Sequence, residues 1–328
     1  MTPRLAVMNP LPDALAHYER ELRETLSRVG EQSVALDARP VEGLEGVLGK
    51  ARMFANAIHN ESVSRDASAA VLTTWPSLGL LDARLVSARR NPRVVILHDP
   101  VPLRQQVGFG RTAREWASRA RQGRRPTILL HSDAAHREAS RLLPRHALLS
   151  ALHPMLNAAP PTRTSQEPVI LVAGQFKPAR DLELLVAIGP KLRKSGLRPQ
   201  IVGRGWPDID GWETDARFVP ETELDDLLAS ASMVLLPYSH YFQSGIAVRA
   251  LENATPTLGA RTGFLEDLLG DGFEGLVDSS RPEEYVERAK QVATVPQPDV
   301  IRLLDNARAR VDDSWRLLVD SLGANRDE

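Results

Sequence analysis

Short apolar runs alternate with helical patterns through the second half of the chain. Three of the runs are too short for an ordinary helix and end in a glycine or proline turn, and they lie at residues 169–173, 200–202 and 233–236. Each therefore predicts a buried parallel strand. Helical patterns follow them at 181–194, 221–231 and 245–253. This order predicts repeated βαβ units, in which ligands bind beyond the carboxyl ends of the strands. The three turns thus predict a nucleotide- or phosphate-binding region.

The first half of the chain shows the same alternation. Its apolar runs predict strands at 4–8, 33–36, 69–73, 93–97, 127–130 and 147–151. The helical patterns between them lie near 17–29, 43–58, 80–90, 112–121 and 133–142. Because strands and helices alternate in both halves, we predict the α/β class with a doubly wound sheet in each.

A proline-rich stretch at 153–168 breaks every periodic pattern, and its composition is typical of a domain linker. A helix restarts at 297 with its apolar positions on one face. We therefore predict a first domain at 1–157, a second at 158–296 and a terminal helix at 297–328. Two placements of that helix stay open, because it can pack back on the first domain or cap the second.

Composition narrows the class of protein. The chain has 328 residues, of which 42% are hydrophobic, and its 41 basic residues nearly cancel its 42 acidic ones. That balance indicates no polyanionic partner such as a nucleic acid. The chain has no cysteine, which excludes disulfides, thiolate metal sites and a cysteine nucleophile. No apolar run approaches the ~18–20 residues of a spanning helix, and none suits a signal peptide, so we expect a cytoplasmic enzyme.

Several turns of the second half agree in order with one family. They are Gly174-Gln175-Phe176-Lys177, Gly203-Arg204-Gly205, Pro237-Tyr238, Gln243-Ser244-Gly245 and Ala254-Thr255-Pro256. In the first half, Trp75-Pro76-Ser77, His98-Asp99, His131-Ser132 and His153-Pro154 each follow an apolar strand or end the domain. The chain resembles the GT-B-fold glycosyltransferases, in particular the large retaining family that includes sucrose synthases and bacterial lipid- and polysaccharide-directed sugar transferases.

The resemblance implies a fold and an activity. It implies two Rossmann-like doubly wound domains that face each other across a cleft, with the nucleotide sugar held by the second. It implies transfer of a hexose-type sugar, with UDP- or GDP-linked donors expected, to a hydroxyl of a glycan, a glycolipid or a small molecule. Retention of configuration and independence from a metal or other cofactor are expected as well.

The leaving diphosphate gains negative charge, so the site needs cations and fixed amides directed at it. Arg180 and Lys177 are the candidate cations, and Ser244, Gly245 and Ile246 would supply amides from a helix start. The other donor-side candidates are Gly174, Gln175, Gly203, Arg204, Tyr238, Gln243 and Glu252. His98 is the first-domain candidate for contact with sugar or acceptor, and the acceptor-side candidates are Asp13, Trp75 and Asp99. Each residue also has a plainer role as turn, cap or core.

The sequence departs from the family pattern at three points. Gln175 stands where the family has an arginine, and Tyr241 and Arg249 stand where it has two glutamates, the second of which usually holds the ribose. Glu252 is a candidate substitute for that second glutamate. Asn9 to Asp13 replace the glycine pair of the first loop. A catalytically silent nucleotide-sugar-binding partner of another transferase therefore stays open as the alternative.

Two further hypotheses come from motifs. A nicotinamide dehydrogenase is disfavoured, because its Gly-x-Gly-x-x-Gly fingerprint follows neither Met8 nor Ala173. The arginine-rich run at 111–125 is either a solvated helix or a peripheral contact with anionic lipid at the inner membrane face. It lacks the interleaved aromatic residues that nucleic-acid binding favours.

Overall fold

The computed structural model describes residues 5–42, 46–86, 91–102, 106–119, 125–162, 167–238 and 240–324. The chain forms two compact units. Unit 1 comprises residues 1–157 and 310–328, and unit 2 comprises residues 158–309. The first division falls at the end of the predicted first domain, and the second falls inside the terminal helix.

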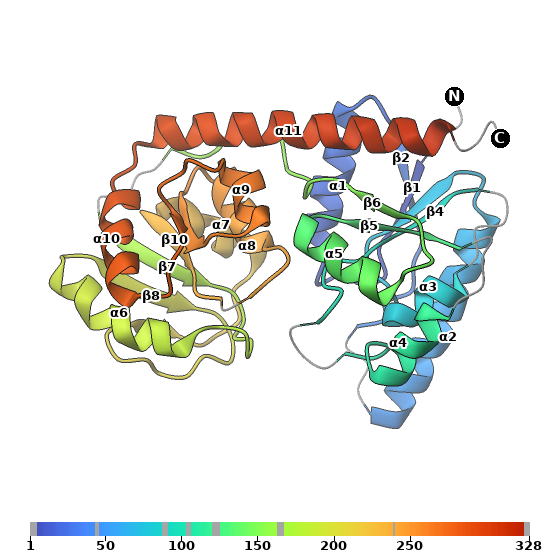
Figure 1. Ribbon diagram of the computed structural model, residues 1–328, viewed down its shortest axis with the longest axis horizontal. Helices are drawn as coiled ribbons and strands as arrows, with labels where there is room; N and C mark the ends of the chain where they lie inside the picture. The colour runs from blue at the N-terminus through green and yellow to red at the C-terminus, as the bar shows by residue number, and fades with distance from the viewer. Residues whose placement is uncertain are drawn as a thin grey trace. The chain divides into compact units, whose positions relative to one another are not determined.

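Unit 1 is built on a parallel six-stranded sheet (Figure 1). Its strands lie in the order β2 (Ser33–Leu36), β1 (Leu5–Met8), β3 (Ala70–Thr73), β4 (Arg93–Ile96), β5 (Thr127–Leu130) and β6 (Leu148–Ser150). The helical elements are α1 (Ala16–Arg28), α2 (Gly46–Asp66), η1 (Gly79–Leu81), α3 (Asp82–Leu85), α4 (Arg111–Ser118) and α5 (Asp133–Leu142). Strands β1 and β4 are buried along their whole length, as expected for parallel strands with both faces covered.

Unit 2 repeats this architecture. Its parallel sheet has the order β12 (Leu276–Val277), β11 (Thr257–Ala260), β10 (Met233–Leu236), β7 (Val169–Ala173), β8 (Arg198–Val202) and β9 (Glu213–Asp215). Its helices are α6 (Leu182–Lys194), α7 (Glu221–Ser230), α8 (Gly245–Glu252), α9 (Gly263–Leu269) and α10 (Pro282–Val292). Asp181, Ser244 and Thr262 cap α6, α8 and α9, each accepting from a backbone N–H of the first turn.

Helix α11 (Gln297–Ala324) contributes to both units. Val300 and Leu304 are buried in its first half, which belongs to unit 2. In its second half Trp315 is fully buried in unit 1, and its Nε1 donates to the Leu152 carbonyl over 2.8 Å. Arg28 on α1 pairs with Asp312 at 2.9 Å. Of the two placements that the sequence left open, the structure shows packing on the first domain for the second half of the helix, while its first half belongs to unit 2.

Several predicted elements have different bounds. The helix expected at 43–58 is Gly46–Asp66, and residues 43–45 lie outside the described part of the chain. The helix expected at 80–90 is the short η1 and α3, with 87–90 outside the described residues. The arginine-rich run is helical over Arg111–Ser118, and 120–124 lie outside.

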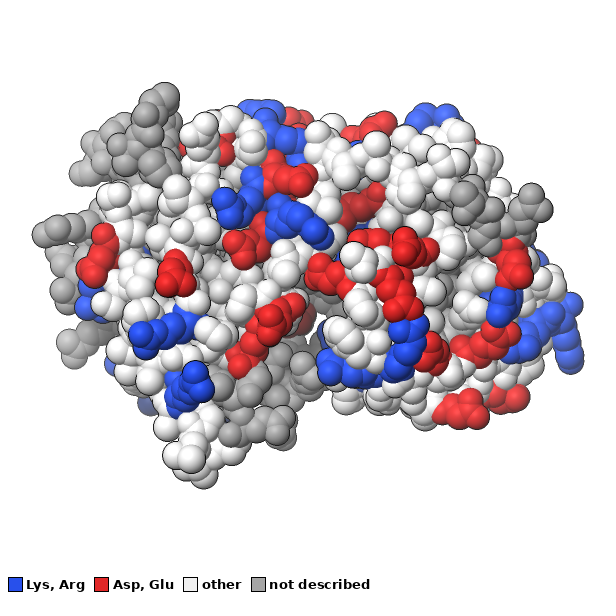
Figure 2. Space-filling model, turned by 180° about the vertical axis from the view of Figure 1, so that it is seen from behind, with Lys and Arg blue, Asp and Glu red and all other residues white. Residues whose placement is uncertain are grey.

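Charge is mixed on the surface. On the face drawn in Figure 2, blue Lys and Arg side chains lie among red Asp and Glu side chains over both units. Within the described ranges, none of the helices combines the length and apolar character that crossing a membrane requires.

Candidate functional site

Two glycine turns meet at the carboxyl ends of β7 and β8. Gly174 follows β7 with a φ of 94°, and Gly203 follows β8 with a φ of 148°. A Cβ atom on Gly203 would lie only 2.2 Å from the Gly174 carbonyl oxygen. The Gly174 N–H in turn donates to the Val202 carbonyl over 2.9 Å. Only glycine at 203 lets the two turns pass this closely.

Arg180 lies beside these turns as a buried cation. Its side chain is 5% exposed, and Nη2 donates to the Ala173 carbonyl over 2.8 Å. The guanidinium carbon stands 4.1 Å from the Tyr238 ring centroid and 5.3 Å from that of Trp206. Nε and Nη1 are closed off from solvent and make no hydrogen bond with any described residue. Burial lowers the pKa of Arg180, and an uncompensated buried charge is costly. Among the described residues, Arg180 is thus a buried cation without an anionic partner.

Backbone and ring contacts hold the loops around Arg180. The Phe176 N–H donates to the Arg204 carbonyl over 2.9 Å, and the Arg180 N–H donates to the Lys177 carbonyl over 2.9 Å. Trp206 donates its Nε1–H to the Gly174 carbonyl over 2.8 Å. The side chain of Lys177 is half-buried, whereas those of Gln175 and Arg204 are exposed. These contacts thus hold the two loops after β7 and β8, which carry Lys177 and Arg180, in a preformed arrangement.

The start of α8 lies against the same turns. Ser244 is buried, and its Oγ accepts from the Ala247 N–H over 3.3 Å. Gly245 is exposed, and a Cβ built on it would meet nothing within 4 Å. Within the described part of the chain, the N–H groups of Gly245 and Ile246 have no acceptor. The Ile246 side chain comes to 3.7 Å of the Cβ position on Gly174, so the structure brings α8 and Arg180 to one place.

Other donor-side candidates fall at different distances from this place. Tyr238 pairs with Arg180 through an antiparallel backbone bridge, and Gln243 immediately precedes the Ser244 cap and is half-buried. Glu252 is the last residue of α8, so it lies roughly 12 Å along the helix from Ser244. Glu252 thus lies at the opposite end of α8 from the Ser244 cap.

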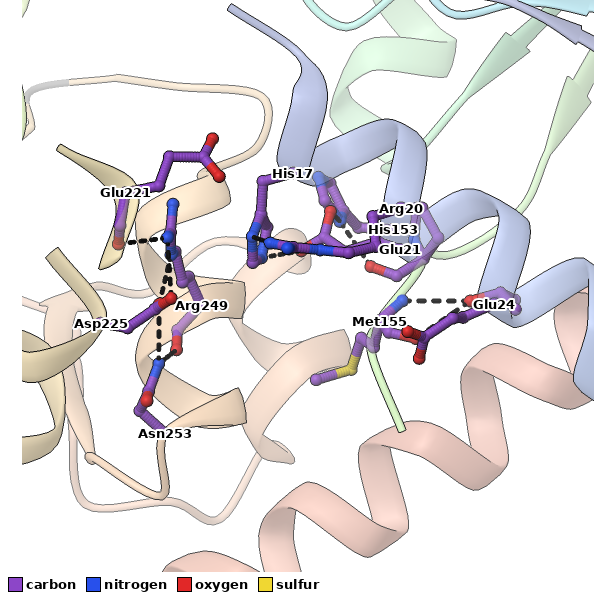
Figure 3. A network of polar contacts seen from close by, with 12 residues as sticks. His17, Arg20, Glu21, Glu24, His153, Met155, Glu221, Asp225, Arg249 and Asn253 are labelled. Atoms are coloured by element: carbon purple, nitrogen blue, oxygen red, sulfur yellow. Dashed lines mark hydrogen bonds and ion pairs between the residues drawn. The ribbon is translucent and has the colours of Figure 1, made fainter. Parts of the chain in front are cut away.

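The two positions where the resemblance expects glutamates have structural contacts. Arg249 is buried on α8 and donates to both carboxylate oxygens of Asp225 on α7, while its Nη2 also reaches the Glu221 carbonyl (Figure 3). Asn253 donates to the same Asp225 carboxylate over 3.3 Å. Tyr241 is buried and accepts from the Thr262 hydroxyl over 3.3 Å. Arg249 thus ties α8 to α7.

In unit 1, His98 follows β4 and is buried. Its Nε2 donates to the Thr74 carbonyl over 2.8 Å. The Trp75 ring stacks on it at 5.5 Å and 23°, and the Tyr18 ring meets it edge-on at 4.6 Å. Asp99 is half-buried beside it in sequence. Asp13 is exposed, and its backbone N–H donates to Glu42 over 2.7 Å.

His98 belongs to a buried cluster that the sequence analysis did not assemble. His131 accepts from the Tyr18 hydroxyl through Nε2 over 2.7 Å and donates from Nδ1 to the Ala151 carbonyl over 2.8 Å. The His153 ring lies 5.4 Å from that of His131. Burial holds the pKa of His131 well below its usual value and lowers that of His153 to about 3. Both rings are therefore neutral at pH 7.

A second group of polar side chains extends along α1. Figure 3 shows His17, Arg20 and Glu21 on that helix with His153 beside them. Arg20 donates to His17 Nδ1 over 2.7 Å, and His17 Nε2 lies 3.2 Å from a Glu21 carboxylate oxygen. The motifs that place a histidine after a strand signalled His131 and His153. No motif signalled Tyr18 or Glu21, which reach the cluster through helix packing.

Comparison with known proteins identifies the fold. No protein-family model matches the chain, and no curated protein matches its sequence. Sucrose-phosphate synthase of Thermosynechococcus elongatus superposes with a TM-score of 0.66 at 13% identity, covering 98% of both chains. HepE of Anabaena, solved with UDP and glucose, gives 0.60 at 12% identity, also covering 98% of both. TarM of S. aureus gives 0.58 at 10% identity over 79% of this chain and 54% of its own, so the chain spans about half of TarM.

These likenesses, at such low identity, define the fold. Both units carry parallel sheets with flanking helices, and full-length superpositions are with proteins of two such domains. The chain therefore has the GT-B fold of two Rossmann-like domains, as the sequence analysis expected.

Proposed function

We propose that the protein is a glycosyltransferase that moves a hexose-type sugar from a nucleotide sugar to a hydroxyl acceptor on a glycan, a glycolipid or a small molecule. The observation that carries the proposal is Arg180, a buried guanidinium with two unpartnered N–H-bearing nitrogens and no carboxylate partner among the described residues. A diphosphate would supply the missing anion. The GT-B fold and the UDP and glucose found in the HepE structure support this choice of ligand.

The arrangement suits a leaving group that becomes more negative. As the bond between the anomeric carbon and the diphosphate oxygen breaks, Arg180 and Lys177 would stabilise the growing charge. The N–H groups of Gly245 and Ile246 would donate to it from the positive end of α8. Because Nε and Nη1 of Arg180 are closed off, donor binding has to move the side chains that cover them.

We further propose that the reaction retains the configuration at the anomeric carbon and needs no metal ion. The departing phosphate would take the proton of the acceptor hydroxyl on the same face of the sugar, so no protein nucleophile is needed. Donor binding should then be unchanged by EDTA. The second candidate is a nucleotide-sugar-binding partner without turnover, which the structural roles of Arg249 and Tyr241 favour.

The test begins with thermal-shift measurements against UDP-, GDP-, ADP- and TDP-linked sugars. A bound donor should raise the melting temperature. In the variant Arg180→Met, which keeps most of the volume, the ligand-free protein should melt at or above the wild-type temperature, because an uncompensated buried charge is gone. Donor affinity should fall by ~2–4 kcal/mol. Arg281→Met is the matched control, since that side chain is 77% exposed.

The outcomes separate the alternatives. An unchanged donor shift in Arg180→Met would remove the diphosphate from this site. A donor-dependent shift without sugar release or transfer to any offered acceptor would favour the silent partner. Transfer with an inverted product would overturn the retaining chemistry alone.

A further inference from the structure

Helix α2 has its polar side chains inside. Its buried residues are Met53, Asn56, Ala57, Asn60 and Ser64. Asn56 donates to the Pro40 carbonyl over 2.7 Å. Asn60 exchanges two hydrogen bonds with the Arg39 backbone, at 2.7 and 2.9 Å. The inward amides are therefore satisfied by the chain itself, and α2 is anchored to unit 1 by these polar contacts together with the apolar packing of Met53 and Ala57.

The outward side of α2 is apolar over its first three turns. Val47 is 85% exposed, Leu48 87%, Phe54 42% and Ile58 70%. At 3.6 residues per turn, Val47, Phe54 and Ile58 fall on one stripe. Ala51 and Ala55 are exposed between them and add no polar group. A contiguous apolar stripe of this kind on a folded domain marks a docking surface.

The charged side chains of α2 itself along the stripe are of one sign. Residues 46–60 contain no Asp or Glu, while Lys50 and Arg52 stand exposed on its two margins. The first acidic residue of the helix is Glu61, which pairs with Arg65 at 3.3 Å beyond the stripe. In Figure 2 the surface of unit 1 at the lower left is mostly white and carries blue groups. Apolar side chains between long cationic ones are the pattern of a helix that lies in a lipid interface.

We propose that the outward face of α2, defined by Val47, Leu48, Phe54 and Ile58 with Lys50 and Arg52, docks on an anionic lipid surface. The helix would lie in the interface plane, with its apolar side chains at the boundary of headgroups and acyl chains. A second copy of the chain fits this face less well, because a twofold contact would bring cations against cations. Anionic headgroups, by contrast, would attract Lys50 and Arg52.

This proposal moves lipid contact away from the arginine-rich run. On α4, Arg111 pairs with Glu115 at 3.2 Å, and Arg114 donates to the Phe109 carbonyl over 3.0 Å. The Trp116 ring is covered by the Arg84 guanidinium at 4.3 Å. Within its described residues, α4 therefore has no comparable apolar stripe.

Vesicle flotation of the full chain tests the proposal. Wild-type protein should float with vesicles of phosphatidylcholine mixed with phosphatidylglycerol, and less with phosphatidylcholine alone or at high salt. The double variant Phe54→Ser/Ile58→Ser should lose about tenfold or more in partition coefficient. Lys50→Gln/Arg52→Gln should lose the preference for the anionic vesicles. Arg111→Gln/Arg114→Gln is the matched control and should float like wild type.

Three results would overturn the proposal. The first is wild-type protein that stays unbound with anionic vesicles, and the second is equal flotation of the Phe54→Ser/Ile58→Ser variant. The third is a wild-type dimer in light scattering that this variant converts to monomer, which would assign the face to a second copy. The four side chains replaced in the two test variants, Phe54, Ile58, Lys50 and Arg52, are exposed, so an unchanged melting temperature verifies that these variants are folded.

Discussion

Burial of an ionisable side chain has opposite consequences at Arg180 and at Asp82. Arg180 is held between aromatic rings and has no anionic partner among the described residues. Asp82 is buried at the start of α3, where its carboxylate accepts from the Leu78 N–H over 3.2 Å. No described cation pairs with it, and burial raises its pKa from 3.8 to about 7. An arginine cannot release its charge near neutral pH, whereas an aspartate can. Of these two residues, only Asp82 therefore makes stability depend on pH.

The variant Asp82→Asn should be more stable than wild type at pH 8 by up to ~4 kcal/mol. The folded pKa of about 7 lies above the unfolded value of 3.8, so the folded state binds more protons between them. The contribution of Asp82 to wild-type stability is thus highest below pH 3.8 and is lost as pH rises through 7. Asparagine keeps the acceptor oxygen and carries no charge. Denaturant unfolding at pH 4 and pH 8 should show the gain only at pH 8.

At the scale of elements, the candidate site depends on the fit between the turns after β7 and β8. Gly203→Ala would place a methyl group 2.2 Å from the Gly174 carbonyl oxygen, in addition to the strain of a positive φ. We expect the unfolding free energy to fall by about 2–4 kcal/mol. We also expect donor binding to be lost. Gly196→Ala is the control, because Gly196 also has a positive φ but a Cβ there would meet nothing within 4 Å.

The comparison of these two variants isolates the close approach. Gly196→Ala should cost about 1–2 kcal/mol, the strain alone, and leave donor binding intact. Equal losses in both variants, measured by denaturant titration and donor thermal shift, would show that the approach of the two turns is unimportant.

The elements that the sequence predicted are those with a buried apolar signal. The strands β7, β8 and β10 contain short apolar runs closed by turn residues, and the run length together with the closing turn is enough to predict them. Strand β9 has the sequence ETD and lies at a sheet edge, so it has no apolar alternation to detect. Helix α2 was placed with bounds too short because its inward face is polar, which masks its amphipathic period.

The candidate site was predictable to the extent that it lies on strand ends. Arg180, Gly174 and Ile246 follow motifs in the sequence, and the structure brings them together. Glu252 is a candidate only from its spacing along a predicted helix. In the structure it is the last residue of α8, at the opposite end from Ser244. Tyr18 joins His98 and His131 only because α1 packs on the ends of distant strands. Such contacts depend on tertiary packing, which no local pattern encodes.

At the scale of the whole molecule, the two units should differ in their response to acid. Seven of the eight histidines lie in unit 1, and His240 is the single one in unit 2. Burial lowers the pKa of His153 to about 3 from 6.5, and lowers that of His131 well below its usual value. The Glu21 carboxylate, 3.9 Å from His153, favours the protonated ring, but the effect of burial on the His153 pKa is larger. The unfolded state therefore binds more protons as pH falls below 6.5.

Between pH 7 and pH 5, His153 should cost unit 1 ~2 kcal/mol of unfolding free energy, with His131 acting in the same direction. Asp82 gains about as much over this range as His153 loses, so the Asp82→Asn background reveals the histidine effect fully. In the Asp82→Asn background, hydrogen exchange at pH 7 and pH 5 should show amides of β4 and β5 losing protection, while those of β7 and β10 keep theirs. His153→Gln should reduce the loss, and His136→Gln, at a half-buried position outside the cluster, should leave it unchanged. Equal loss of protection in both units would contradict the assignment of acid sensitivity to this buried cluster.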